Sequence, residues 1–354
     1  MDQNVPAPDP VPASQAQPAP QVVVNCGASP FRRLFGWLGW IGFALCLLIL
    51  ISQSVALRQY FNRSEGVRER YYSGGRYVRD KVAIISVTGT ILDGEHVRRQ
   101  INRARDDDNV KAVVVRIVSP GGTIAGSDYI HHHLRKLREE KEIPLVVSMG
   151  GIAASGGYYV AMAVGEQERS IFAEPTTTTG SIGVMIPHYD ISGLLQRFEI
   201  EDRTLSTHPN KRMLSMTRPM TDDQREILEA YLNSAMDRFK DIILQGRPVF
   251  REDPAALDQL ATGEIFTAGQ AKKHGLIDEI GFLEAAIERA LELAGLDEDK
   301  TRVVEYHRPP SLFDLPWTTS SRLSPGMQDL AALFDGTAPR AYYLASTLPP
   351  LMSR

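Results

Sequence analysis

The sequence predicts an α/β fold with a mostly parallel sheet covered by helices, preceded by one transmembrane helix. Two observations lead to this prediction. From about residue 80, short and nearly continuous apolar runs alternate with segments of helical periodicity, and one long uncharged apolar run precedes them. Strands that are buried on both faces read as continuous apolar runs, because neither face meets water. Helices between such strands are the crossovers that a parallel sheet requires.

Each element follows from its local pattern. We expect strands over 82–91, 111–120, 144–153 and 180–187, with helices around 94–106, 123–141 and 155–165 between them. After residue 220 the chain becomes helical. Thr221 followed by Gln224 three residues later has the spacing of a capping box and predicts where the first of these helices begins. The segment 282–295 shows apolar residues at helical spacing and predicts a second helix.

The apolar run over 34–57 contains no charged residue. As a helix it would extend roughly 36 Å, which is enough to cross a bilayer with some tilt. We therefore expect an uncleaved, single-pass anchor in the cell (inner) membrane. A cleaved signal peptide is the alternative, since Ser52 and Ser54 resemble a small-residue cleavage site, but the run exceeds a typical signal-peptide core. Arginines flank both ends, so charge leaves the membrane sidedness open.

Whole-chain composition excludes several function classes. The 354 residues carry a net charge of −4, which gives no general attraction for nucleic acid. The two cysteines, Cys26 and Cys46, precede the expected folded domain, which excludes a disulfide scaffold and a cysteine-ligated zinc site there. We divide the chain into a Pro/Ala-rich disordered tail (1–33), the anchor (34–57), a linker (58–79), the α/β domain (80–305) and a C-terminal extension (306–354).

Three glycine-containing turns each follow a predicted strand, over 119–122, 150–157 and 179–181. In a parallel sheet such turns gather at the carboxyl ends of the strands, where ligands usually bind. Ser155 lies where the second of these turns enters a helix, and the N–H groups at a helix start favour a developing anion. A tight turn that lets helix and sheet pack closely would give the same spacing, so the turn alone leaves the role of Ser155 open.

The order of these motifs is more informative than any one of them. SPGG, GIAASGGYYVA and TTTTGSIGVM are followed by RPMT (218–221) and GEIFTAGQAKKHGLIDEIGFLEAAIERA (263–290). This series resembles the signal peptide peptidase A family of Ser/Lys serine proteases, over roughly residues 80–305. The resemblance implies the Clp/crotonase-like fold of repeated ββα units. The single apolar helix ahead of the domain is similar to the short form of that family, which has one catalytic domain.

The resemblance also implies roles for individual residues. The family nucleophile falls on Ser155, and the family base falls on Lys211, in a loop ahead of RPMT. Four residues ahead of this lysine (207–210) depart from the Ser-Gly pair that the family often has. Ser181 matches the serine that hydrogen-bonds the lysine. The oxyanion hole falls on the N–H groups of Gly122 and Gly156. A lysine amine can act as a base only when neutral, which requires a site that excludes water.

The function implied by the resemblance is endopeptidase cleavage of short membrane-derived peptides, notably signal peptides left after secretion. The domain would lie outside the cytoplasm and assemble into a ring-like homo-oligomer, in which Ser155 and Lys211 could meet across a subunit boundary. The expected partners are peptide substrates and the lipid bilayer, with no nucleic acid. We expect no cofactor and no metal ion.

Several alternatives stay open at this point. His188 and Asp190 follow the nucleophile in the order of a Ser-His-Asp triad. The tract His131–His133 resembles a metal-binding tract, but successive helical residues point in different directions, and we expect a partly exposed surface instead. A crotonase-type enzyme acting on an acyl-CoA thioester would use the same oxyanion hole without a nucleophilic serine. A catalytically silent membrane scaffold would keep only the fold.

Overall fold

The computed structural model describes residues 40–54, 66–307 and 342–344, in two units divided between residues 60 and 61. The first unit contains an exposed helix over 40–54, within the predicted anchor. Among the described helices, none combines the length and the apolar character that a bilayer crossing requires. The rest of the anchor, the N-terminal tail and a short helix expected near 326–334 lie outside the described residues.

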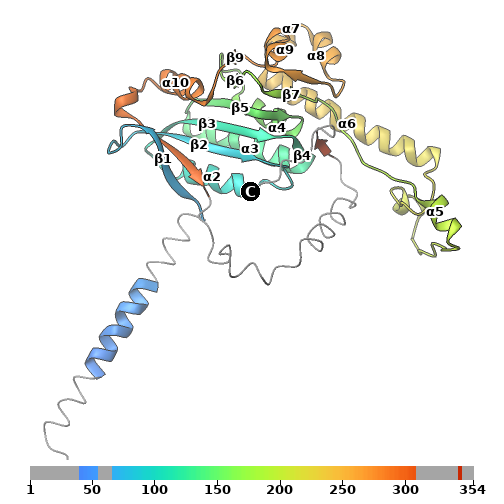
Figure 1. Cartoon of the computed structure of the whole chain (residues 1–354), viewed down its shortest axis with the longest axis horizontal. Helices are drawn as coiled ribbons and strands as arrows, with labels where there is room; N and C mark the ends of the chain where they lie inside the picture. Colours follow the sequence, from blue (N-terminus) through green and yellow to red (C-terminus); the bar gives the residue numbers. More distant parts are fainter. Residues whose placement is uncertain (1–39, 55–65, 308–341, 345–354) are drawn as a thin grey trace, which may run out of the picture. The chain divides into compact units, whose positions relative to one another are not determined.

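The second unit is organised around a nine-stranded sheet (Figure 1). Six of its strands run parallel in the order β10-β2-β3-β5-β6-β9, and β1 joins the edge antiparallel to β10. β7 pairs parallel with β5, and β8 pairs antiparallel with β7. The bounds are β1 Arg68–Gly74, β2 Lys81–Thr88, β3 Val110–Ser119, β5 Leu145–Ala154, β6 Ile171–Ala173, β7 Thr178–Gly180, β8 Ile265–Thr267, β9 Glu279–Ile280 and β10 Arg302–His307.

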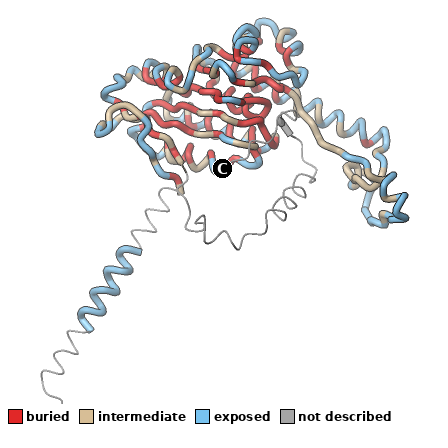
Figure 2. Tube along the Cα trace, in the orientation of Figure 1, coloured by how far each residue is buried: buried red, intermediate tan, exposed pale blue. Residues whose placement is uncertain are grey.

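Helices cover both faces of this sheet, as the sequence predicts. Along β2, Ala83 and Ile85 pack in one core with residues of α2 (Glu95–Arg105) and α3 (Ile124–Lys141). Val82 and Ile84 point the other way and pack in a second core with α10 (Leu283–Ala294). Alternate residues of a strand face opposite sides, so the four successive residues from Val82 to Ile85 are all buried. Figure 2 shows the resulting buried strands in red between the exposed outer helices.

Most of the predicted elements are confirmed. β2, β3 and β5 lie in the first three predicted strands, and α2 and α3 match the predicted helices. The helix expected over 155–165 consists of α4 (Gly156–Ala161) followed by the 3-10 helix η1 (Met162–Val164). Thr221 forms the predicted capping box with Gln224. The sheet also extends into the stretch predicted as a linker, because β1 pairs there with β10.

The strand expected over 180–187 is wrong. β7 ends at Gly180, and Ser181 has a φ of 50°, which turns the chain out of the extended conformation. The Ser181 N–H donates to the carbonyl of Glu264, and the carbonyl of Ile182 accepts from Gly263 N–H. Ile182 is therefore buried by the loop around residue 263. The apolar pattern of this segment marks burial beneath a loop instead of pairing within the sheet.

A long helix carries a separate group of elements away from the sheet. α6 (Asp222–Gly246) packs against the body through its C-terminal part, where Phe239, Ile242, Ile243 and Gly246 are buried. Residues 188–220, which we call the outer arm, include α5 (Ser192–Arg197) and the 3-10 helix η2 (Pro209–Arg212). Figure 1 shows α5 beside the end of α6 that is remote from the sheet. Three short helices complete the unit: α7 Val249–Glu252, α8 Pro254–Leu260 and α9 Ala268–Lys273.

Candidate active site

Ser155 lies at the junction between β5 and α4, at the carboxyl end of a central strand. It has φ 54° and ψ −115°, a strained conformation for a residue with a side chain. Its exposed fraction is 1%, and within the described part of the chain its Oγ has no hydrogen-bond partner. A strained turn from strand to helix is how hydrolases present a serine nucleophile. A buried hydroxyl without a partner is costly and suggests that a reaction partner supplies the missing contact.

Ser181 lies beside Ser155, as the predicted site requires. β5 pairs with β7 up to Ala154 and Gly180, so the two serines follow a matched pair of residues on neighbouring strands. The Ser155 N–H donates to the carbonyl of Gly180 at 2.7 Å and fixes the turn against β7. Both serines have positive φ angles. Tight turns at adjacent strand ends thus bring the two hydroxyl-bearing residues to the same edge of the sheet.

The glycine turn after β3 forms the short strand β4 (Gly121–Thr123), which runs past the start of α4. The carbonyl of Gly121 accepts from Ile91 N–H at 2.8 Å, and the Thr123 N–H donates to the Ile91 carbonyl at 2.7 Å. Backbone groups of successive strand residues face opposite edges, so the N–H and carbonyl of Gly122 face away from Ile91. A Cβ on Gly122 would come within 1.9 Å of the Ile91 carbonyl oxygen, so glycine is required at this position.

A second strand occupies that free edge of β4. β11 (Tyr342–Leu344), from the C-terminal extension, pairs antiparallel with β4, with residue 343 opposite Gly122. β11 also contacts α3 and α4, the helix that follows Ser155. The edge of β4 beside Ser155 therefore pairs with an extended strand of the same chain through main-chain groups. No sequence motif predicts this pairing, because β11 lies more than 200 residues from β4 along the chain.

Lys211 is not brought to Ser155 within one chain. It lies exposed in η2, which begins after His208 in the outer arm. The carbonyl of Pro209 in η2 accepts hydrogen bonds from Arg218 and from Gln224, in the first turn of α6. From Gln224 to Phe239, where α6 enters the core, the helix extends roughly 22 Å. The predicted base therefore lies at the outer end of α6, and the predicted nucleophile, Ser181 and Gly122 gather at the sheet.

The geometry does not favour the histidine triad. His188 lies at the base of the outer arm, where its Nε2 is 3.3 Å from the carbonyl oxygen of Ser215. Asp190 Oδ1 instead accepts from the backbone N–H of Ser192, and hydrogen bonds from Ser192 hold the pKa of Asp190 below its usual value. A catalytic aspartate must orient the histidine ring through its carboxylate. Here the two side chains have other partners.

The histidine tract needs a correction. His131 is buried, with an exposed fraction of 3%, whereas we expected a partly exposed surface. Its ring packs against Tyr159 with centroids 5.4 Å apart, and burial lowers its pKa to about 4. His132 is exposed and His133 half-buried, and their two rings meet edge to face with centroids 5.2 Å apart. Within the described ranges, no group of three or more potential ligands could hold a metal ion.

The fold is a mostly parallel sheet between helices, and its site presents a serine at a strand-to-helix turn, as serine hydrolases do. Residues 137–297 match Peptidase family S49. The chain is 29% identical over 308 residues to a putative signal peptide peptidase SppA of Enterococcus faecium, covering 78% of this chain and 87% of the relative. It is 35% identical over 237 residues to a putative protease of Synechocystis sp., covering 66% and 82%.

A third relative is longer. Protease 4 of Haemophilus influenzae is 31% identical over 258 residues, which span 70% of this chain and 39% of that protein. Taken together, these similarities show that the chain belongs to Peptidase family S49, alongside the SppA and Protease 4 proteins. The protein is therefore a serine protease, and the resemblance drawn from its sequence motifs is confirmed.

Proposed function

We propose that this serine protease is a membrane-anchored endopeptidase that cleaves short extended peptides, with Ser155 as nucleophile and Lys211 as base. One observation carries the proposal: the edge of β4 that bears the Gly122 N–H accepts an extended strand beside a buried, unpartnered serine hydroxyl. Peptide bonds of a substrate in this position run past Ser155. The name of the Enterococcus relative supports signal peptides as the substrate class.

The reaction would proceed through an acyl-enzyme. Ser155 Oγ attacks the peptide carbonyl carbon while its proton passes to the neutral amine of Lys211. The N–H groups of Gly122 and Gly156 donate to the resulting oxyanion. When the C–N bond breaks, the lysine returns the proton to the leaving amine. Water then attacks the ester by the same path and releases Ser155. Ser181, next to the nucleophile, would orient the amine.

The position of Lys211 supports a dyad formed between subunits. A base that is exposed on an arm, roughly 22 Å of helix from its own core, can reach a serine in a neighbouring molecule. The arm and α6 also expose large apolar side chains that a neighbour would cover, among them Leu194, Phe198, Ile200, Leu205 and Tyr231. We therefore propose a homo-oligomer, ring-like by family resemblance, in which each subunit gives its lysine to the next.

The apolar run over 34–57 supports anchoring in the membrane, which would hold the protease close to membrane-derived peptides. Family resemblance is the basis for proposing that the catalytic unit faces away from the cytoplasm. The membership in a protease family favours this function over an acyl-CoA enzyme.

The decisive test is a covalent serine-directed inhibitor, such as a phosphonate, applied to the full-length protein in detergent. Mass spectrometry should place the label on Ser155, and peptide hydrolysis should stop in proportion to labelling. Absence of both hydrolysis and labelling would favour the silent scaffold. A label on another serine, with activity lost, would overturn the assignment of the nucleophile.

Carbonate washing of membranes tests the anchor, because an integral protein stays in the pellet.

A further inference from the structure

We infer that Asp128 is a positioning residue. It sets the angle at which α6 leaves the core, and this angle determines the position of Lys211 at the outer end of that helix. This inference rests on the proposed function, because it concerns the arm that carries the proposed base. It begins from a cluster in which three helices meet behind the nucleophile: α3 with Asp128, α4 with Tyr159, and α6 with Arg238. Of these three side chains, only Tyr159 lies within a motif of the active site.

Asp128 holds two other helices through one oxygen atom. Its Oδ1 accepts from the hydroxyl of Tyr159 at 2.5 Å and from Arg238 Nη2 at 3.0 Å. Burial by itself would raise the pKa of Asp128, but the hydrogen bonds from Tyr159 and Arg238 outweigh it and lower that pKa. The carboxylate is therefore charged at neutral pH, and both of its hydrogen bonds are strengthened by that charge.

Tyr159 connects this cluster to the nucleophile. It lies one turn into α4, and its N–H donates to the carbonyl of Ser155 at 2.9 Å. Its fully buried ring packs against Phe239 of α6, with centroids 5.2 Å apart. The helix that begins at Ser155 and the helix that carries the outer arm therefore meet at one tyrosine. Asp128 fixes the hydroxyl of that tyrosine and the neighbouring arginine together.

The length of α6 makes the angle at this point matter. Arg238 and Phe239 lie where α6 enters the core, and the first turn of α6 binds η2, which contains Lys211. Over roughly 22 Å of helix, a tilt of about 10° moves the outer end by about 4 Å. This displacement exceeds the length of a hydrogen bond. A base must lie within about 3 Å of the hydroxyl that it deprotonates, so a small change in angle would remove it from reach.

The ion pair between Asp128 and Arg238 should contribute little to stability. The Asp128 and Arg238 side chains are 43% and 53% exposed, and ion pairs this exposed contribute at most about 1 kcal/mol. Misplacing a catalytic group by about 1 Å can cost up to ~100-fold in rate. Loss of the carboxylate should therefore lower kcat strongly while Tm changes little. A residue that only supports the fold would lower activity in proportion to the unfolded fraction.

The first experiment compares single variants of the full-length enzyme. Asp128→Ala should lower kcat roughly tenfold or more, with KM and Tm nearly unchanged. Asp128→Asn, which keeps an acceptor oxygen, should recover most of the activity. The control is Glu292→Ala, which removes an exposed carboxylate paired with Arg289 within α10 and should leave kcat unchanged. A kcat within twofold of wild type for Asp128→Ala, or a loss matched by a fall in Tm, would overturn the inference.

The second experiment identifies which subunit needs Asp128. In verified mixed oligomers, a Ser155→Ala subunit supplies only the lysine and a Lys211→Ala subunit supplies only the serine. Adding Asp128→Ala to the lysine-supplying subunit should lower the recovered activity roughly tenfold, and adding it to the other subunit should have little effect. An equal loss of activity in both arrangements would overturn the positioning role of Asp128 but not the dyad between subunits. No recovered activity in the parent pair would overturn the dyad between subunits, and this inference with it.

Discussion

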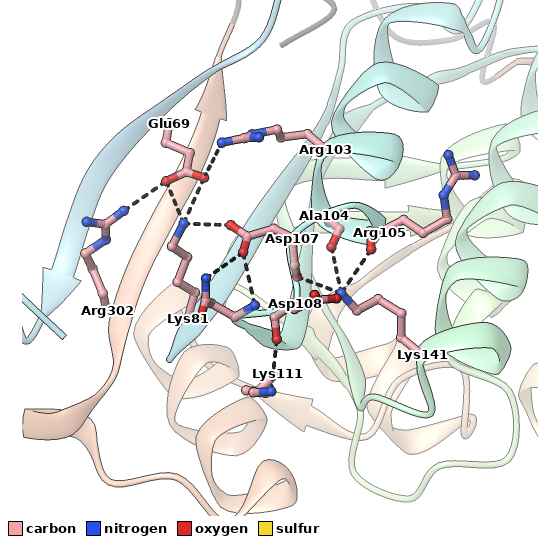
Figure 3. A network of polar contacts seen from close by, with 11 residues as sticks. Glu69, Lys81, Arg103, Ala104, Arg105, Asp107, Asp108, Lys111, Lys141 and Arg302 are labelled. Carbon is pink, nitrogen blue, oxygen red and sulfur yellow. Dashed lines mark hydrogen bonds and ion pairs between the residues drawn. The ribbon is translucent and has the colours of Figure 1, made fainter. Parts of the chain in front are cut away.

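The two ends of the parallel sheet are built in opposite ways. At the amino end of β2, Lys81 bonds Glu69 at 3.0 Å and Asp107 at 2.7 Å, and Glu69 also accepts from Arg103 and Arg302 (Figure 3). At the carboxyl end of β5, the Ser155 hydroxyl is buried without a partner in the described part of the chain, on a strained backbone. The amino end pairs its charged groups with one another, and the carboxyl end leaves a reactive hydroxyl available.

This difference between the two ends shows which part of the sheet stabilises the fold and which part carries strain. The amino-end network joins β1, β10, β2 and the turn before β3, so its charges hold together strands that are distant in sequence. Nearby, the Lys141 ammonium donates to the carbonyls of Ala104, Arg105 and Asp107 at the end of α2. A fold secured at this end can hold strain at the other, which is a common arrangement in active sites.

The largest effect should come from Ser155→Ala. We expect peptide hydrolysis to fall by about 10⁶-fold in kcat, because the acyl-enzyme can no longer form. The free energy of unfolding should hardly change, since the smaller side chain fits the same turn. Urea unfolding and a peptide hydrolysis assay measure the two quantities. If activity stays within tenfold of wild type, Ser155 is not the nucleophile, and the carboxyl end of the sheet is not the reactive end.

Replacing the proposed base should have the next largest effect. Lys211→Arg should be as damaging as Lys211→Ala, because a guanidinium stays protonated and cannot accept the proton. His188→Ala should cost little and serves as the control. The reverse result, activity lost with His188→Ala and kept with Lys211→Ala, would place the protein with the histidine triads.

At the amino end, substitution should affect stability and leave catalysis alone. Glu69→Gln leaves three nearby cations without their shared carboxylate and should destabilise the fold by about 3 kcal/mol. The control is Glu139→Gln, which breaks an exposed pair with Arg135 and should change the unfolding free energy by less than about 1 kcal/mol. Denaturant unfolding gives the free energies. A large fall in kcat for Glu69→Gln at a temperature where it is folded would contradict this division.

The acid limit of stability should depend on the amino-end network. Burial alone would raise the pKa of Asp107, but hydrogen bonds from Lys81 and Asn109 outweigh it and hold that pKa below the usual value. An aspartate with a lowered pKa stabilises the fold above its unfolded pKa, and this stabilisation is lost as pH falls through the folded value. In Asp107→Asn, the free energy of unfolding should therefore fall less steeply than in the wild type as the pH drops below about 4. Unfolding measured from pH 3 to 6 would show an unchanged slope if the network were unimportant.

His131 should change the pH dependence of stability at higher pH and leave stability at neutral pH nearly unchanged. Burial lowers its pKa to about 4, so between about pH 4 and 6.5 the unfolded chain binds a proton that the folded chain excludes. Stability from this residue should therefore rise with pH across that window. His131→Phe, which keeps a ring against Tyr159, should remove this part of the slope. An unchanged slope in the variant would show that the histidine is solvated.

Much of this molecule follows from its sequence by itself. Continuous apolar runs predicted β2, β3 and β5, and the residues around Thr221 predicted the start of α6, because strand burial and helix capping depend on neighbouring residues. The motifs identified the protease family and placed Ser155 beside Ser181, since parallel strands end at one edge.

The contacts between distant segments were decided only by the tertiary structure. The pairing of β1 with β10, and of β11 with β4, joins segments more than 200 residues apart, and no local pattern specifies such partners. The burial of His131 and the convergence of Asp128, Tyr159 and Arg238 arise where three helices pack. The separation of Lys211 from Ser155 is set by the length and direction of α6. Such contacts depend on how distant elements meet in space, which the side chains along one segment do not encode.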